Sequence, residues 1–214
     1  GVTVDLANGT ATDGYGDVDT LIDIERVSGS QYADQITGDD GDNVFRGKGG
    51  DDIIDGGDGI DQLRMDRAPS GVEVDLSAGT VTIDGYGGSD TISNIENVRG
   101  SEFDDIIVGD NEVNVLEGRD GDDVLSGGAG NDTLDGGSGR DIADYSGGTA
   151  GITVTLANNS VVDGYGDTDT LIDIERIMGS EFSDSFTGSD GDDYLDGGGG
   201  NDTIDGGLGD DVLI

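Results

Sequence analysis

Apolar residues recur along this chain at a spacing of nine. The repeats form three arrays, and each repeat has Gly at position 1, Asp or Asn at position 6 and a mostly apolar residue at position 8. No other position is so regularly apolar, so we expect position 8 to form a stacked core with short strands around it. It is filled by Ile36, Phe45, Ile54, Leu63, Ile107, Leu116, Leu125, Leu134, Ala143, Phe186, Leu195, Ile204 and Leu213.

Positions 1 to 6 of each repeat predict a turn. Glycine at positions 1, 2 and 4 permits positive φ and lets backbone carbonyls converge on one point. If two repeats make one coil, the chain returns to the same side every eighteen residues. Turns two repeats apart then stack directly, at the strand spacing of about 4.8 Å.

Longer segments, which we call interludes, separate the arrays. Each begins with alternating apolar residues, as in Val2, Val4 and Leu6, which predicts a strand with one buried face. Asn8-Gly9 follows and predicts a hairpin. A degenerate repeat comes next and places Asp at position 6, and its three copies contribute Asp19, Asp90 and Asp169. Frequent glycine and β-branched residues oppose any substantial helix.

The two periods divide the chain into three units. These are 1–64 (interlude 1–28, nonapeptides 29–64), 65–144 (interlude 65–99, nonapeptides 100–144) and 145–214 (interlude 145–178, nonapeptides 179–214). The middle unit is longer by about one nonapeptide, which is how a stacked solenoid grows. We expect one continuous solenoid, with three blocks joined by hairpins as the alternative.

Charge narrows the choice of partner. The chain has 49 acidic and 9 basic residues, a formal charge of −40, and 43 glycines. Such a chain repels nucleic acid and anionic membranes, favours cations, and folds poorly without them. Histidine and cysteine are absent, which excludes the usual zinc ligands, and no apolar run predicts membrane insertion. Salt adaptation explains the acidity less well, because the Asp residues fall at a fixed phase of the repeat.

The stacked turns suit calcium. Carboxylates about 5 Å apart repel one another by around 1 kcal/mol even in water. Calcium relieves this, since it accepts six to eight carboxylate or carbonyl oxygens in flexible geometry. Magnesium requires a stricter octahedron and should substitute poorly.

The repeat resembles the RTX, or haemolysin-type calcium-binding, family, whose pattern is Gly-Gly-x-Gly-x-Asp-x-U-x. Gly127–Asp135 is a clean copy, and Gly118–Arg140 matches most closely. The resemblance implies a right-handed parallel β-roll that holds calcium between glycine-rich turns, with position 6 and backbone carbonyls as ligands. The position-6 candidates are Asp34, Asn43, Asp52, Asp61, Asp105, Asn114, Asp123, Asp132, Asp141, Asp184, Asp193, Asp202 and Asp211, of which the two neutral Asn should give weaker sites. The position-4 candidates are Gly41, Gly50, Gly59, Gly121, Gly130, Gly139, Gly191, Gly200 and Gly209.

Several calcium ions are expected, up to about seven in the regular arrays. Three sites are strict, with Gly at position 4 of both turns: Gly41 with Gly59, Gly121 with Gly139, and Gly191 with Gly209. The first repeat of each array instead carries an aromatic residue at position 4, which we interpret as a core plug: Tyr32, Phe103 and Phe182. Whether Asp19, Asp90 and Asp169 add further ions is left open.

The predicted function is that of a calcium-binding structural module, not an enzyme, within a larger exported bacterial protein. An EF-hand pattern is absent, and paired carboxylates are explained by the repeat rather than by acid–base catalysis. The resemblance implies type I secretion, a secreted or cell-surface location, flanking domains in the same chain and folding on calcium outside the cell. The alternative is a calcium-stabilised recognition or adhesion module for polysaccharide or another surface.

Overall fold

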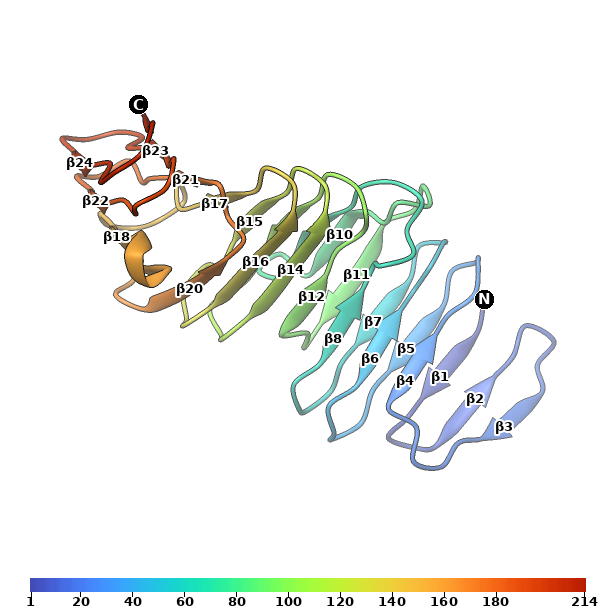
Figure 1. Cartoon of the computed structure of the whole chain (residues 1–214). Helices are drawn as coiled ribbons and strands as arrows, with labels where there is room; N and C mark the ends of the chain where they lie inside the picture. Colours follow the sequence, from blue (N-terminus) through green and yellow to red (C-terminus); the bar gives the residue numbers. More distant parts are fainter. The chain divides into compact units, whose positions relative to one another are not determined.

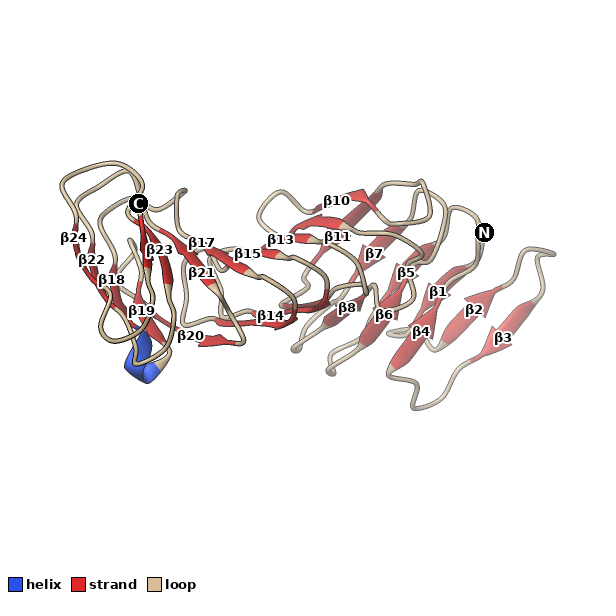
Figure 2. Ribbon diagram, turned by 45° about the horizontal axis from the view of Figure 1, so that its top comes forward, coloured by secondary structure: helices blue, strands red, loops and turns tan.

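The computed structural model describes all 214 residues and is an all-β solenoid of the β-roll type. Its only helical segment is a three-residue 3-10 turn, Leu156–Asn158, drawn in blue in Figure 2. The chain folds as two compact units, unit 1 (Gly1–Ile106) and unit 2 (Ile107–Ile214). None of its helical structure is long and apolar enough to cross a bilayer.

Unit 1 contains two sheets of short strands (Figure 1). In one sheet the order is β9 (Glu73–Asp75), β10 (Thr80–Ile83), β11 (Asp90–Ser93), β7 (Ile53–Asp55), β5 (Gln35–Thr37), β1 (Thr3–Asp5), β2 (Thr10–Thr12) and β3 (Val18–Thr20). In the other sheet it is β12 (Asn97–Arg99), β8 (Gln62–Arg64), β6 (Val44–Arg46) and β4 (Arg26–Ser28). Successive nonapeptides therefore alternate between the sheets.

Unit 2 repeats this arrangement. One sheet has the order β25 (Val212–Leu213), β23 (Tyr194–Asp196), β21 (Arg176–Met178), β17 (Ile142–Asp144) and β15 (Val124–Ser126). The other has β24 (Thr203–Asp205), β22 (Ser185–Thr187), β18 (Thr153–Thr155), β19 (Ser160–Val162), β20 (Thr168–Ile172), β16 (Thr133–Ser138) and β14 (Val115–Asp120). The remaining strand, β13 (Ile106–Val108), begins at the border of the two units.

The strand register confirms the coil of two repeats. β5 pairs in parallel with β7 so that Ile36 lies beside Ile54, and β14 pairs with β16 so that Leu116 lies beside Leu134. Position 8 is buried from Ile36 to Leu195, as the nine-residue period predicts. The stack loosens at its last repeats, where Ile204 is half-buried and Leu213 is 46% exposed.

The predicted hairpins are present. β1 and β2 pair antiparallel across Asn8-Gly9, and Gly9 has a φ of 62°. The equivalent turns place Gly79 at 68° and Asn159 at 52°, in the left-handed region that Gly and Asn tolerate.

The interludes also form a second hairpin that the pattern did not predict, because the degenerate repeat pairs antiparallel with the strand before it (β2 with β3, β10 with β11, β19 with β20). β11 and β20 also pair in parallel with strands of the preceding array, β7 and β16. Inside each unit, therefore, an interlude extends the sheets of the array before it. The division into three sequence units stays a prediction.

The aromatic residues at position 4 do not plug the core. Tyr32 is 71% exposed, and Phe103 and Phe182 are each 46% exposed. Position 4 belongs to the turn at the edge of the coil, whereas the interior is filled by position 8. The expectation of core plugs is therefore wrong.

Candidate metal centre

The stacked turns place glycine where other residues would be strained or would clash. Positive φ occurs at position 2 or 4 of many repeats, and not at position 1, in Gly50, Gly57, Gly59, Gly121, Gly128, Gly130, Gly137, Gly139, Gly198, Gly200, Gly207 and Gly209. Position 1 requires glycine for another reason. A Cβ on Gly47 would lie 2.3 Å from Oδ2 of Asp52, and a Cβ on Gly127 would lie 2.3 Å from Oδ2 of Asp132. Position 1 thus leaves room for the position-6 carboxylate, which corrects the expectation of positive φ there.

Turns two repeats apart approach closely through their backbones. In the three strict pairs, a Cβ on the later glycine would lie very close to the carbonyl oxygen of the glycine eighteen residues earlier. The distances are 2.8 Å for Gly59, 1.7 Å for Gly139 and 2.4 Å for Gly209. The partners are Gly41, Gly121 and Gly191, as predicted. Backbone carbonyl oxygens are therefore concentrated between consecutive turns.

One oxygen of most position-6 carboxylates accepts a hydrogen bond from the coil before it. Oδ1 of Asp61 accepts a hydrogen bond from the backbone N–H of Asn43 at 2.7 Å. Oδ1 of Asp132 accepts one from Asn114 at 2.9 Å, and Oδ1 of Asp141 accepts one from Asp123 at 2.8 Å. These bonds form a ladder along the edge of the roll. Within an array, the backbone N–H at position 6 donates to the position-6 side chain eighteen residues later.

The other oxygen is left without a partner at four of these residues. Oδ2 of Asp52, Asp61, Asp132 and Asp141 is buried and makes no hydrogen bond. A buried carboxylate oxygen without a partner is unfavourable, and in native proteins such an oxygen calls for an ion or another explanation. Burial raises the pKa of Asp132 to about 7, and it raises the pKa of the other three to about 6. The metal-free fold therefore holds carboxylates that favour either a proton or a cation.

The oxygens at the turns fit calcium. No three acidic side chains converge closely enough to bind one ion by themselves. The shell must then combine a few carboxylate oxygens with the carbonyls between the turns, and calcium accepts that mixture. Without His or Cys, the donor set does not suit zinc.

The first repeat of each array differs from this scheme, and so does the second repeat of the last array, where Ser189 donates to both oxygens of Asp193. Ser30, at position 2, donates its backbone N–H to Oδ2 of Asp34 at 2.5 Å and its hydroxyl to Oδ1 at 2.8 Å. Ser101 and Ser180 bind the equivalent carboxylates, Asp105 and Asp184, in the same way. Serine at position 2 therefore satisfies both oxygens of these carboxylates within their own turns.

The two Asn residues are also satisfied locally. Oδ1 of Asn43 accepts the backbone N–H of Asp39 at 2.9 Å, and its amide donates to the Asp39 carboxylate at 3.1 Å. Asn114 makes the same two contacts with Asp110. The backbone N–H of each Asn donates to the ladder, at Asp61 and Asp132, and the neutral side chain adds no charge to the turn.

The last array and the degenerate repeats are placed less uniformly. Asp193, Asp202 and Asp211 are half-buried, and the ladder continues from Asp193 to Asp211 at 3.1 Å. Of the degenerate repeats, Asp90 and Asp169 are buried and join the ladder, accepting from Asp52 and Asp132 at 3.0 Å each. Asp19 is exposed on β3, which pairs only with β2. The remaining candidates, the glycines at position 4, lie in the stacked turns described above.

Two glutamates that the nonapeptide pattern does not include end the ladder. Oε2 of Glu96 accepts the N–H of Asp61 at 2.7 Å, and Oε2 of Glu175 accepts that of Asp141 at 2.8 Å. Both occupy the Ile-Glu step that recurs in each interlude. That recurrence was the available signal, but glutamate lies outside the nonapeptide pattern, so its role required the fold.

Comparison with known families agrees with this geometry. Residues 28–63, 108–143 and 178–213 match the sequence model of the RTX calcium-binding nonapeptide repeat (4 copies). Together they make up just over half of the chain. No curated protein matches the chain.

Proposed function

Because this chain belongs to the RTX family of calcium-binding nonapeptide-repeat proteins, we propose that it is a structural module which folds when its stacked turns bind calcium. The observation that carries this proposal is the set of buried, unpartnered Oδ2 atoms on Asp52, Asp61, Asp132 and Asp141. Each of these oxygens is a candidate ligand for a cation, and the closely approaching turns supply the carbonyl oxygens of the shell.

Metal binding and folding form one event in this proposal. The ligands of a site come from turns eighteen residues apart, so the site does not exist in the extended chain. Without the ion, the burial of these charged carboxylates destabilises the folded state. Extracellular calcium modules bind in the range of about 10⁻⁴ to 10⁻³ M, so such a module stays unfolded at cytosolic calcium and folds outside the cell.

The location and context follow from the same reasoning. RTX repeats are typical of secreted bacterial proteins, and a chain that folds only at extracellular calcium remains unfolded during export through a type I system. Flanking domains of a longer protein then use the roll as a calcium-stabilised scaffold. A structural role without catalysis suits a repeat in which every position is taken by core, turn or ligand.

The test is a calcium titration followed by far-UV circular dichroism, with Asp132→Asn and Asp58→Asn as a matched pair. Both variants lose one carboxylate, but Asp132 is a buried candidate ligand and Asp58 is exposed. We expect a cooperative coil-to-β transition with calcium, little response to magnesium, and a shift to higher calcium for Asp132→Asn only. A full β signal and an unchanged melting temperature without calcium would exclude the proposal.

A recognition role is a second candidate, favoured by two exposed aromatic residues. Tyr15 is 95% exposed and Tyr32 is 71% exposed, and aromatic faces of this kind bind sugar rings. They border an open groove of about 430 Å³ lined by Gly1, Val2, Gly14, Tyr15, Ser30 and Tyr32. A glycan array probed with calcium present tests this role. Binding that Tyr15→Ala and Tyr32→Ala abolish supports it, and no binding to any polysaccharide rejects it.

A further inference from the structure

The interlude turns contain an aspartate that the nonapeptide pattern does not include. Asp84 precedes the Gly85-Tyr86-Gly87 turn, and its Oδ1 accepts the backbone N–H groups of Tyr86, Gly87 and Gly88 at 2.7 to 2.9 Å. Asp163 holds the equivalent turn of unit 2 in the same way, accepting from Tyr165, Gly166 and Asp167 at 2.8 to 2.9 Å. One oxygen of each carboxylate is thus fully used in shaping the turn.

The second oxygen of each carboxylate is buried and has no partner. Asp84 is 0% exposed and Asp163 is 4% exposed, and Oδ2 makes no hydrogen bond in either residue. Turn formation explains Oδ1 but leaves Oδ2 unexplained, because a neutral Asn would shape the same turn without burying a charge. Two independent copies of this arrangement, one in each unit, point to a function for Oδ2.

In unit 1, other cation-binding oxygens lie beside Asp84. The point that a Cβ on Gly88 would occupy is 2.8 Å from Oδ2 of Asp84 and 2.3 Å from the carbonyl oxygen of Gly50. These two oxygens are therefore about 5 Å apart at most, a separation that one calcium spans with ligands at about 2.3–2.6 Å. Asp52 belongs to the same turn as Gly50, and its Oδ2 is also buried without a partner.

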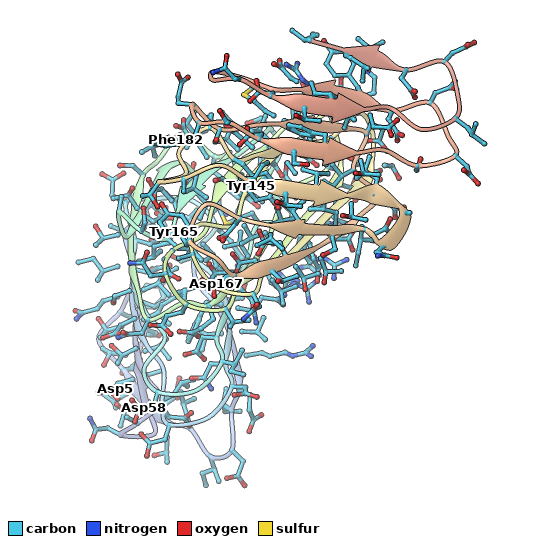
Figure 3. The ribbon with its side chains drawn as sticks, turned by 90° about the vertical axis from the view of Figure 1, so that its left-hand side faces the viewer. Asp5, Asp58, Tyr145, Tyr165, Asp167 and Phe182 are labelled. Atoms are coloured by element: carbon cyan, nitrogen blue, oxygen red, sulfur yellow. The ribbon has the colours of Figure 1, made fainter.

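In unit 2, the same elements meet. The N–H of Asp132 donates to Oδ1 of Asp169 at 3.0 Å. This bond holds the degenerate repeat of the interlude against the turn of Asp132. The N–H of Gly130 contacts Oδ2 of Asp167 at 3.2 Å. Oδ2 of Asp132 and Oδ2 of Asp163 are both unpartnered. Figure 3 labels Asp167 in this turn, together with Tyr165.

The charges at these junctions interact. Besides burial, repulsion from Asp169 and then from Asp163 raises the pKa of Asp132. In unit 1, burial comes first and repulsion from Asp52 and Asp84 follows among the causes that raise the pKa of Asp90 to about 7. The carboxylates of each junction are therefore close enough to favour a shared cation.

We propose that each junction between an array and the following interlude binds a calcium ion through a ligand outside the nonapeptide repeat, Asp84 with Asp52 in unit 1 and Asp163 with Asp132 in unit 2. The inference rests on the proposed calcium-dependent function and extends it to the interludes. The ion fixes the interlude turn to the array before it, so the solenoid passes through the interlude without losing its stacking. Asp13, the third copy of the motif, is half-buried on the β2–β3 hairpin, and in this structure β3 pairs with β2 and with no strand of an array.

The experiment counts calcium ions by native mass spectrometry in the full chain and in three variants, Asp84→Asn, Asp163→Asn and Asp13→Asn. Asn keeps Oδ1 as the acceptor for the turn N–H groups and replaces Oδ2 with the amide nitrogen, which cannot bind a cation. We expect one calcium fewer in each of the first two variants, two fewer in their double variant, and no change in Asp13→Asn. Circular dichroism at saturating calcium checks that each variant is folded.

Wild-type calcium counts in both Asp84→Asn and Asp163→Asn overturn the inference and leave the proposed function standing. A wild-type chain that binds no calcium rejects both.

A second measurement leaves every ligand in place, in case a variant fails to fold. Terbium(III) bound at the junctions is sensitised by the adjacent Tyr86 and Tyr165, so Tyr86→Phe with Tyr165→Phe should lower the emission. The exposed Tyr15→Phe is the control and should leave it unchanged. Equal emission from the double variant and this control contradicts the junction sites.

Discussion

The metal-free roll should be more stable in mild acid than at neutral pH, and Asp132 is the residue on which this depends most clearly. Its carboxylate is buried, one oxygen lacks a partner, and burial raises its pKa from 3.8 to about 7. A carboxyl group with a raised pKa in the folded state favours folding while it is protonated. That contribution is fully present below about pH 4 and is lost as the pH rises through about 7.

The magnitude is large compared with the stability of a domain. A rise in pKa from 3.8 to about 7 corresponds to about 4 kcal/mol against the charged folded form. A typical domain has only about 5–15 kcal/mol of net stability. The pKa values of Asp52, Asp61 and Asp141, raised by burial to about 6, act in the same direction at slightly lower pH. Calcium reverses the effect, because it binds the charged carboxylates.

The assay is far-UV circular dichroism of calcium-free protein between pH 8 and pH 5, repeated with calcium. We expect the β signal of the metal-free chain to grow as the pH falls, and the calcium midpoint to rise because protons compete for the ligands. Asp132→Asn should show more β signal than wild type without calcium at pH 7.5, yet need more calcium to complete folding. Asp58→Asn removes the same charge from an exposed position (Figure 3) and should do neither. A metal-free β signal that is flat or falls toward acid refutes the reasoning.

Three further predictions concern core, turn and cap. Leu134→Ala should lower the free energy of unfolding of the calcium-saturated protein by about 3–5 kcal/mol because Leu134 is fully buried, whereas Leu213→Ala, 46% exposed, should cost far less. Urea denaturation measures both, and equal losses would contradict a core built on position 8. Gly137→Ala should weaken calcium-induced folding more than Gly16→Ala: both have φ near 90°, but only at Gly137 would the Cβ meet a backbone carbonyl, at 2.1 Å. Calcium titrations of the two variants decide this, and matching midpoints count against turn stacking. Ser180→Ala should lower thermal stability by about 1–2 kcal/mol without changing the calcium count, since its hydroxyl caps a carboxylate and binds no ion; a lost ion would show that the cap assignment is wrong.

The fold could be predicted largely from the sequence because period and chemistry coincide in it. Position 8 had to be the core, since no other position is regularly apolar, and the register Leu116 beside Leu134 followed from two repeats per coil. The Asn8-Gly9 hairpin was readable from local preference alone. The second hairpin of each interlude was not, because its strand is a degenerate repeat that pairs antiparallel only in the context of the first hairpin.

Site chemistry divides in a similar way. The repeat pattern predicts position 6 as the ligand position and does not distinguish Asp34 from Asp132. The fold separates them, because Ser30 satisfies both oxygens of Asp34 whereas Oδ2 of Asp132 stays without a partner. The aromatic residue Tyr32 shows the same limit. The pattern predicts it in the core, whereas the turn in which it lies exposes it to solvent.

The sequence by itself determined the nine-residue unit, the stacked core at position 8 and the calcium chemistry, because these depend on residue type at a fixed phase. Only the tertiary structure decided which carboxylate oxygens lack partners, where Glu96 ends the ladder, and how Asp84 meets the turn of Asp52. Those facts depend on groups about eighteen to forty residues apart that meet only when the coils stack. Which aspartates have both oxygens satisfied and which keep an unpartnered oxygen for a cation is therefore a property of the fold rather than of the repeat.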